Sequence, residues 1–225
     1  MARPVVFTLS LTAASANNIA LSQTPVSGTA LTLNGSAVTG GVATLDTQRR
    51  VELAYGNEVS NRTMIITGTN DAGAAISETL AIPSGGSGVV DTNQDFFTIK
   101  SALPAGGGWT AAVTLGTNTV GSSPWYVPNT HITPFEVGAS FEVTTGAVNA
   151  TVEFTSDAVL MPIPIYQPGY SQALPVATPI GFSGMTSLAA AATGTITIPC
   201  LGIRLTINSG TGIGRLELIQ AGIRN

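Results

Sequence analysis

The sequence predicts an all-β protein: two antiparallel β-sandwich or jelly-roll-like domains, with a long Pro-rich loop in the second. Three observations support this fold class. Apolar and polar residues alternate with a period of two along most of the chain, as in strands that bury one face. Turn-forming residues separate these segments, since the 225 residues include 26 Gly and 13 Pro. Helical periodicity is scarce, and the only helix predicted is a short one at residues 187–193, where four consecutive Ala occur.

The predicted strands are separated by Gly, Asn or Asp turns. Asn34-Gly35 and Gly40-Gly41 supply the positive φ angles that tight turns require, so residues 29–46 are predicted to form a small β-meander. Residues 70–73 form a similar turn between two well-patterned segments. The predicted strands are 5–11, 30–33, 42–45, 50–55, 62–68, 76–82, 95–101, 110–115, 135–137, 140–144, 148–155, 195–199, 203–208 and 214–220.

The strongest break between well-patterned halves of the chain lies at residues 121–124, Gly-Ser-Ser-Pro. We therefore expect one domain at residues 1–124 and a second at residues 125–225. Residues 5–11 could be mistaken for the apolar part of a signal peptide. Because Thr8, Ser10 and Thr12 alternate with apolar residues, we interpret this segment as a strand of the first domain.

Five Pro residues lie between positions 162 and 184, together with Tyr166 and Tyr170. Pro at this density prevents ladder pairing and favours an extended backbone. A loop of this length inside a domain usually has a function. Two interpretations fit the segment equally well: an arm that reaches a neighbouring subunit, or a long cover over its own domain.

Charged residues are unusually rare. The chain has 8 Lys and Arg and 12 Asp and Glu, which is 9% of its residues, whereas about a quarter is typical of soluble domains. The net charge of −4 and the scattered cations give no basic patch, so we expect no direct contact with nucleic acid. No segment approaches the about 18 consecutive apolar residues of a membrane helix, so no membrane partner is expected. Weak repulsion between copies favours a component of an assembly.

The chain has few groups for catalysis, and we expect it not to be an enzyme and to use no cofactor. His131 is its only His, and no Gly-x-Ser-x-Gly motif supplies a nucleophile beside it. Cys200 is its only Cys, which excludes an intrachain disulfide. It lies in an apolar, strand-like segment, so we expect a small buried side chain there.

The residues with metal-like spacing are Asp91, Asn93 and Asp95, whose oxygens resemble the start of a calcium loop. Phe96 stands where such a loop needs Gly, and no bidentate Glu follows at its far end. We interpret this segment as a turn that begins a strand, and keep a metal site as the weaker alternative.

Six residues are candidates for an interface. Trp125 and Tyr126 lie next to the predicted domain boundary, where an exposed pair would anchor a partner and a buried pair would join the domain cores. Tyr166 and Tyr170 lie in the Pro-rich segment. Arg49 and Arg50, which are adjacent in the sequence, are the last two interface candidates.

Two parts of the sequence resemble a known family. Residues 62–73 (RTMIITGTNDAG), continued by residues 76–80 (ISETL), resemble a β-hairpin of tailed-bacteriophage virion proteins. Residues 203–212 (IRLTINSGTG) and 216–222 (LELIQAG) are similar to the closing hairpin of such proteins. The resemblance implies a virion structural component of the capsid decoration or cement type. It assigns no functional residue.

From the resemblance and the low charge we expect a protein of the outer capsid surface that binds the major capsid protein and stabilises the joints between capsomers. We expect it to associate with itself, as a dimer or a trimer. Two alternatives stay open. A hydrolase on a β scaffold would need His131 or a carboxylate pair in a pocket. The other is a β module of the tail, neck or fibre that binds carbohydrate. Such a module should expose an aromatic platform or an acid cluster.

Overall fold

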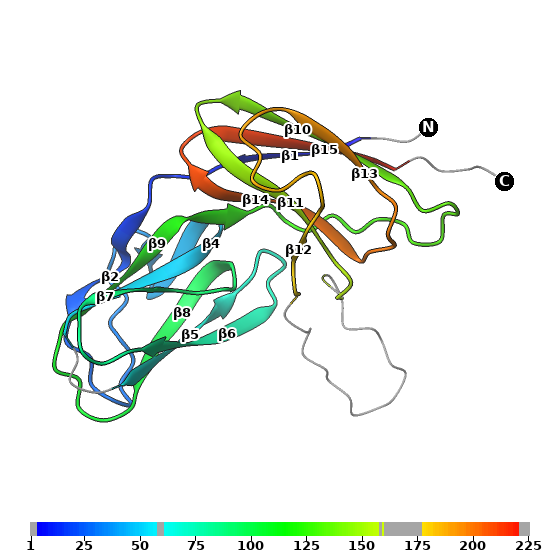
Figure 1. Ribbon diagram of the computed structural model, residues 1–225. Helices are drawn as coiled ribbons and strands as arrows, with labels where there is room; N and C mark the ends of the chain where they lie inside the picture. Colours follow the sequence, from blue (N-terminus) through cyan, green and yellow to red (C-terminus); the bar gives the residue numbers. More distant parts are fainter. Residues whose placement is uncertain (1–3, 58–60, 158, 160–176, 221–225) are drawn as a thin grey trace, which may run out of the picture. The chain divides into compact units, whose positions relative to one another are not determined.

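The computed structural model describes residues 4–57, 61–157, 159 and 177–220, and in these residues the protein is all-β with antiparallel pairing (Figure 1). The all-β prediction is therefore confirmed. Among the described residues there is no helix that could cross a membrane.

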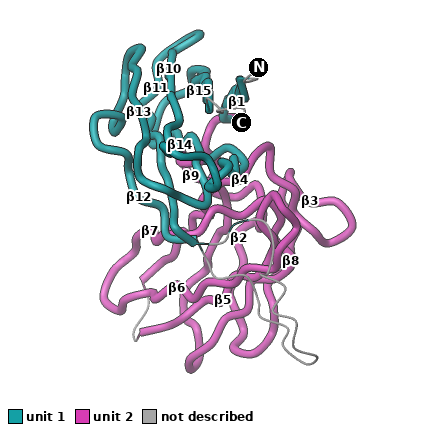
Figure 2. The backbone as a smooth tube through the Cα atoms, turned by 90° about the vertical axis from the view of Figure 1, so that its right-hand side faces the viewer, with its two compact units in different colours: residues 1–11, 122–225 teal, residues 12–121 magenta. Residues whose placement is uncertain are grey.

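The chain divides into two compact units (Figure 2). Unit 2 is the continuous stretch Thr12–Gly121, and unit 1 combines Met1–Leu11 with Ser122–Asn225. The chain thus passes from one unit to the other close to the expected position of residue 124. Residues 5–10, however, belong with the C-terminal part of the chain, because they pair with a strand near its end. Unit 2 is therefore inserted in the sequence of unit 1.

Unit 1 contains a four-stranded sheet with the order β1-β15-β10-β13. Its strands are β1 (Val5–Ser10), β10 (Val137–Thr145), β13 (Ala192–Ile196) and β15 (Ile213–Gln220). β1 pairs with β15 from Val5 opposite Leu218 to Ser10 opposite Ile213. These segments form strands because alternate residues are apolar and can all face one core.

A second layer of unit 1 consists of β12 (Ile180–Gly181), β11 (Val148–Thr155) and β14 (Gly202–Gly210), in that order. The core lies between the layers and includes Phe141, Val152, Leu205 and Leu216, all almost completely buried. Burying each such side chain contributes about 1.5–3 kcal/mol of transfer free energy, before the entropy lost on folding is counted.

The segment expected to be a closing hairpin is instead a crossing between the two layers of unit 1. β14 pairs with β11, whereas β15 pairs with β1 and β10. The preceding pair, β10 and β11, crosses between the layers in the same way. The two corners lie against each other, since a Cβ at Gly146 would be 2.8 Å from the Cα of Gly212.

Unit 2 contains β2 (Ser15–Gln23), β3 (Val38–Thr39), β4 (Val42–Tyr55), β5 (Arg62–Thr69), β6 (Ala75–Ile82), β7 (Gly88–Asp91), β8 (Phe96–Ala105) and β9 (Val113–Ser122), whose last residue already belongs to unit 1. The order is β9-β4-β8-β5-β6, with β2 on β9 and with β3 and β7 on β4. Its core includes Ile19, Leu53, Met64, Phe96 and Leu115. The predicted hairpin of residues 62–82 is confirmed as the β5–β6 pair.

The predicted helix at residues 187–193 was wrong. Ser187 has a φ of 54°, and the last two residues of the segment belong to β13. The backbone of Leu188 instead pairs with Ala150 of β11, with N–H···O distances of 2.6 and 2.9 Å. Because a helix of two turns is marginal alone, pairing with an adjacent strand satisfies these backbone groups better.

Candidate functional site

The surface most suited to a partner is the side of the β1-β15-β10-β13 sheet that faces away from the core, here called the outer sheet face. The strand registers place its members in cross-strand rows, such as Val6, Glu217, Ser140 and Thr193. The members are exposed or half-buried and mostly small and neutral: Val6, Thr8, Ser10, Gly138, Ser140, Glu142, Thr193, Thr195, Ile213, Arg215, Glu217 and Ile219.

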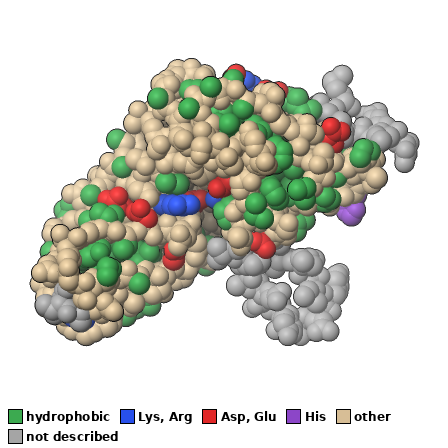
Figure 3. Space-filling model, in the orientation of Figure 1, with side chains coloured by type: hydrophobic (Ala, Val, Ile, Leu, Met, Phe, Trp, Pro, Cys, Tyr) green, Lys and Arg blue, Asp and Glu red, His purple; other side chains and the backbone are tan. Residues whose placement is uncertain are grey.

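The three charged members of the outer sheet face are joined by ion pairs, which leaves one net negative charge. Arg215 Nη1 donates to Glu142 Oε1 at 2.8 Å, and Nη2 donates to Glu217 Oε2 at 3.2 Å. The hydrogen bond to Glu142 raises the pKa of Arg215, so the guanidinium stays charged. The space-filling view in Figure 3 shows charged side chains as small separate groups among neutral ones. A partner laid on the outer sheet face would therefore meet little uncompensated charge.

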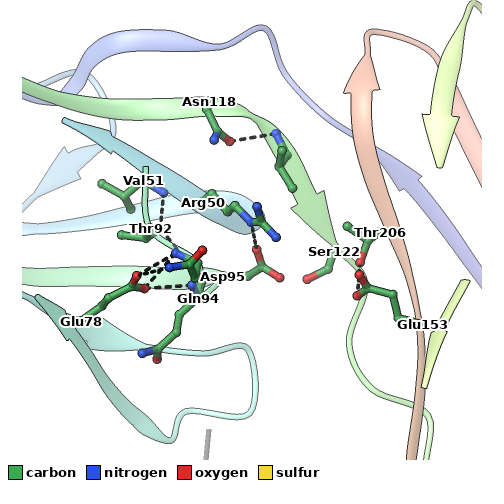
Figure 4. A network of polar contacts seen from close by, with 12 residues as sticks. Arg50, Val51, Glu78, Thr92, Gln94, Asp95, Asn118, Ser122, Glu153 and Thr206 are labelled. Carbon is green, nitrogen blue, oxygen red and sulfur yellow. Dashed lines mark hydrogen bonds and ion pairs between the residues drawn. The ribbon is translucent and has the colours of Figure 1, made fainter. Parts of the chain in front are cut away.

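A second cluster in unit 1 centres on Arg204 of β14, which is 6% exposed. Its Nε donates to Glu153 Oε2 at 2.8 Å, and its Nη1 donates to Ser122 Oγ at 2.9 Å. Thr206 Oγ1 donates to the same Glu153 oxygen at 2.7 Å, a contact visible in Figure 4. The guanidinium lies 4.5 Å from the ring centroid of Trp125. These contacts hold the buried cation within its own unit.

This cluster anchors residues 122–126 to β14. Ser123 N donates to Leu205 O, and Leu205 N donates to Ser123 Oγ. Tyr126 and Ile203 exchange two backbone hydrogen bonds of 2.8 Å each. Burial raises the pKa of the Tyr126 hydroxyl.

Trp125 and Tyr126, predicted as interface candidates, are half-buried and pack on their own unit. The ring of Trp125 also lies close to Gly202, where an added Cβ would be 2.9 Å from its Cε3. A side chain at position 202 would therefore push against the ring.

Arg49, another interface candidate, is completely buried in unit 2. Its Nη1 donates to the backbone oxygen and to Oγ1 of Thr12 and to both oxygens of Asp46, and its Nη2 donates to Asn118 O. Burial by itself would raise the pKa of Asp46, but the Thr12 N–H and the Arg49 charge outweigh it and lower the pKa. Arg49 is therefore a structural residue, which corrects its expected role at an interface.

Arg50, the remaining cation of the pair, has a side chain that is 32% exposed. Its Nε lies 3.7 Å from Oδ1 of the buried Asp95. Figure 4 shows the two side chains pointing toward each other. Alternation along β4 cannot place both members of an Arg-Arg pair on one face, so one is buried and one reaches the surface.

Residues 91–95, the candidate metal loop, are held by a protein carboxylate. Glu78 of β6 accepts from Asn93 N at 2.8 Å and from Gln94 N at 2.9 Å, and also from Asn93 Nδ2. Asp91 is at the end of β7, opposite Glu52 in register. In the part of the chain that the structure describes, no group of three or more His, Cys, Asp and Glu is placed to hold a metal.

The two residues considered for nucleophilic or acid-base chemistry lie in ordinary surroundings. His131 is exposed, and its backbone N–H donates to Asn129 Oδ1 at 3.0 Å. Cys200 is 1% exposed, as expected, and burial raises the pKa of its thiol to about 11. A buried thiol of this kind is a poor nucleophile.

Tyr166, Tyr170 and most of the Pro-rich segment lie outside the described residues. The end of the predicted arm, however, belongs to unit 1. β12 pairs with β11, Phe182 N donates to Val152 O, and Met185 is completely buried. The arm therefore cannot extend as far as residue 184, because residues 180–185 pack on their own unit.

The clusters around Arg204 and Glu78 were not predicted. Residues 203–207 alternate apolar and polar side chains, so the sequence places Arg204 on the polar face of a strand and gives no signal that it is buried. Its partner Glu153 lies 51 residues earlier, and no local pattern connects the two residues.

The fold and surfaces define an all-β protein of two antiparallel units, with a neutral outer sheet face and internally paired charges. No protein-family model matches the chain, and no curated protein matches it in sequence.

Proposed function

We propose that this protein is a non-enzymatic structural component of a bacteriophage virion, a decoration or cement protein on the outer capsid surface. Its partners are the major capsid protein and other copies of itself. It acts by burying surface across the joints between capsomers, and the small contribution of each copy is multiplied over many copies.

The observation that carries this proposal is the outer sheet face. Protein interfaces are depleted of charge at their centre, because an unpaired charge loses its hydration on burial. The charged residues of this face are joined by ion pairs at 2.8 and 3.2 Å, and the rest is Gly, Ser, Thr, Val and Ile. Burying the neutral part of this face would therefore cost less in desolvation than burying a charged surface, whereas burying its ion-paired residues would still carry a penalty.

The internal pairing of charges supports a structural role for the rest of the molecule. Arg49 and Arg204 are both buried and engaged with their own units. The proposed outer location is also consistent with the net charge of −4, since an acidic protein is repelled by packaged DNA.

A carbohydrate-binding module of the tail, neck or fibre remains the alternative, and the described Trp residues give it little support. Sugar platforms need an open aromatic face. Trp109 is 7% exposed, and Arg204 lies over the ring of Trp125. Binding of the isolated protein to a glycan array would favour this alternative.

Cryo-electron microscopy of the phage particle that carries this chain tests the proposal. We expect density for the two units at repeated positions on the outer surface of the head. Density confined to the tail or neck would contradict the capsid assignment, as would absence of the protein from purified particles.

A surface variant tests the role of the outer sheet face. Ser140→Glu combined with Thr193→Glu adds two charges to one row of the face, and both side chains are exposed. We expect capsid occupancy to fall at least tenfold, because unpaired charges would be buried. The control is Thr79→Glu on β6, an exposed Thr of unit 2, which should leave occupancy unchanged. Equal capsid occupancy of the wild-type protein, the double variant and the control variant would exclude this face as the contact.

The arm remains a prediction for the part of the Pro-rich segment that precedes β12. Deleting residues 163–176 should reduce both capsid occupancy and the heat resistance of the particle if the segment reaches a neighbour. Unchanged values of both would contradict the arm and favour a cover over its own unit.

A further inference from the structure

β1 is an edge strand of the four-stranded sheet, with β15 as its one neighbour among the described strands. Its sequence, VVFTLS, contains no charge, no Pro and no Gly. An edge strand leaves one row of backbone N–H and C=O groups available to another chain. Val6, at 44% exposure, adds an apolar side chain beside that row.

Edge strands of soluble proteins usually carry Lys, Pro or a bulge that prevents such pairing. β1 has none of these features, and its register with β15 is regular over all six residues. β-branched and aromatic residues without charge are also the composition that pairs most readily. The free edge of β1 is therefore suited to pair with another strand.

We propose that the occupant is β1 of a second copy, paired antiparallel about a two-fold axis perpendicular to the sheet. The two four-stranded sheets would then become one sheet of eight strands, with core and outer faces continuous across the axis. Because no charge lies on β1, self-pairing brings no like charges into direct contact.

The alternation of β1 limits the possible registers. Val5, Phe7 and Leu9 face the core side, and Val6, Thr8 and Ser10 face outward. Each residue must lie opposite one of its own face, so a central two-fold pairing is centred on Val6, Phe7 or Thr8.

The charges on β15 distinguish these registers weakly, since they would lie about three strand spacings, roughly 14 Å, apart, and the register centred on Phe7 avoids like charges in a row. Glu217 lies beside Val6, and Arg215 lies beside Thr8. Centring on Phe7 places Val6 opposite the second copy's Thr8, so that each row has Glu217 at one end and the second copy's Arg215 at the other. Centring on Val6 would align Glu217 with its own equivalent, and centring on Thr8 would align Arg215 with its own equivalent.

This inference rests on the proposed function only in taking a second copy as the partner, and it can be tested without capsids. Pairing of two edge strands of six residues each buries a small area, so we expect a weak dimer with a Kd between about 1 µM and 1 mM. Sedimentation equilibrium of the full chain over this concentration range measures it.

Two double variants of the full chain test the register. Val6→Lys with Thr8→Glu places Lys opposite the second copy's Glu, and it also puts each new charge beside an opposite charge on β15. Val6→Lys with Thr8→Lys places Lys opposite Lys in both rows. We expect the Lys/Glu variant to dimerise at least as well as the wild type, and the Lys/Lys variant about tenfold more weakly.

The matched control lies at the other edge of the same sheet. Thr193→Lys with Thr195→Lys adds the same charges to exposed positions of β13, and dimerisation should not change. Thermal unfolding of each variant verifies that the fold is kept. Cross-linking provides a second readout, because Val6→Cys with Thr8→Cys should form a covalent dimer on oxidation.

Several results would overturn the proposal. They are a wild-type protein that stays monomeric up to about 1 mM, equal weakening of the Lys/Glu and Lys/Lys variants, and weakening by the β13 control. A monomeric protein whose Lys/Lys variant loses capsid binding, while the variant with Lys at positions 193 and 195 keeps it, would assign the β1 edge to the capsid protein. A dimer that is absent from the phage head would leave the self-pairing standing and remove the proposed function.

Discussion

Replacing Arg204 with Met should destabilise unit 1 strongly. Met keeps most of the volume of the Arg stem and can still pack on Trp125, so the main change is the loss of the guanidinium. Glu153, whose side chain is only 13% exposed, then remains as a charge without its cation. Ser122 Oγ also loses the donor that lies 2.9 Å away in the native protein.

The magnitude follows from the burial of the pair. Removing one member of a buried ion pair costs about 3–5 kcal/mol, because the remaining charge is poorly solvated. The residual exposure of Glu153 and its hydrogen bond from Thr206 reduce this penalty. We therefore expect a loss of about 3 kcal/mol in the free energy of unfolding of unit 1. Adding Glu153→Gln removes the orphaned charge and should restore about 2 kcal/mol of that loss.

Urea unfolding followed by Trp fluorescence measures this loss. The chain has two Trp residues, and Trp109 lies in unit 2, so a Trp109→Phe background leaves Trp125 as the reporter of unit 1. This separation matters because the two units need not unfold together.

Arg215→Met is the matched control. Arg215 also pairs with two groups in unit 1, but its side chain is 37% exposed, and water can solvate the Glu residues left behind. We expect almost no change in unfolding. Equal losses for the Arg204 and Arg215 variants would refute the reasoning that burial decides the cost, as would a double variant no more stable than Arg204→Met alone.

Three further predictions concern single positions. Burial and then the charge of Asp91 raise the pKa of Glu52, so ionised Glu52 destabilises the folded state. Glu52→Gln should therefore raise the melting temperature at pH 7. This gain should vanish below about pH 4.5, where Glu52 is protonated in both the folded and the unfolded state. Cys200 should react with a thiol reagent at pH 8 only after urea unfolding, because its pKa is about 11 and it is buried; fast labelling of the native protein would contradict this. Gly68→Ala should cost about 2 kcal/mol or more in calorimetry, because its Cβ would lie 1.8 Å from a backbone oxygen of β8, whereas Gly86→Ala, with open space around it, should be neutral.

Strand positions were predictable where one face is buried and the other exposed. The segment 62–82 is an example, since the alternation of Met64 and Ile66 with Thr63 and Thr67 survives in the burial of β5. The turn also followed from sequence, because Gly73 has a φ of +78°. Both properties are local and need no knowledge of distant residues.

Strands with an irregular pattern were missed or split. β2 contains Asn17 and Asn18, which hide its period of two, and it was not predicted. Residues 42–45 and 50–55 are parts of the single strand β4, whose register with β8 shifts between Thr44 and Arg49. At that shift Gln48 and Arg49 are both buried, which a simple alternation does not allow.

The burial of the candidate residues likewise depends in some cases on their neighbours in sequence and in others on distant strands. The sequence could predict that Cys200 is buried, because its apolar neighbours are adjacent in the chain. It could not predict that Arg49 is buried beside Thr12 and Asn118, because the partners of a buried cation are chosen by strand pairing. The sequence also could not predict that the Glu78 carboxylate accepts hydrogen bonds from the backbone of residues 93 and 94, which follow a different strand.

The sequence by itself determined an all-β chain with few charges, the turns between most strands, and the neutral residues available for the outer surface. These follow from side-chain alternation and from the φ angles that Gly and Asn allow, which act over a few residues. The tertiary structure alone decided that β1 joins β15, that β14 and β15 lie in different layers, and that Arg204 meets Glu153 and Trp125. Each of these depends on bringing together segments far apart in the chain, and only the packing of a complete core compensates the entropy lost in closing such loops.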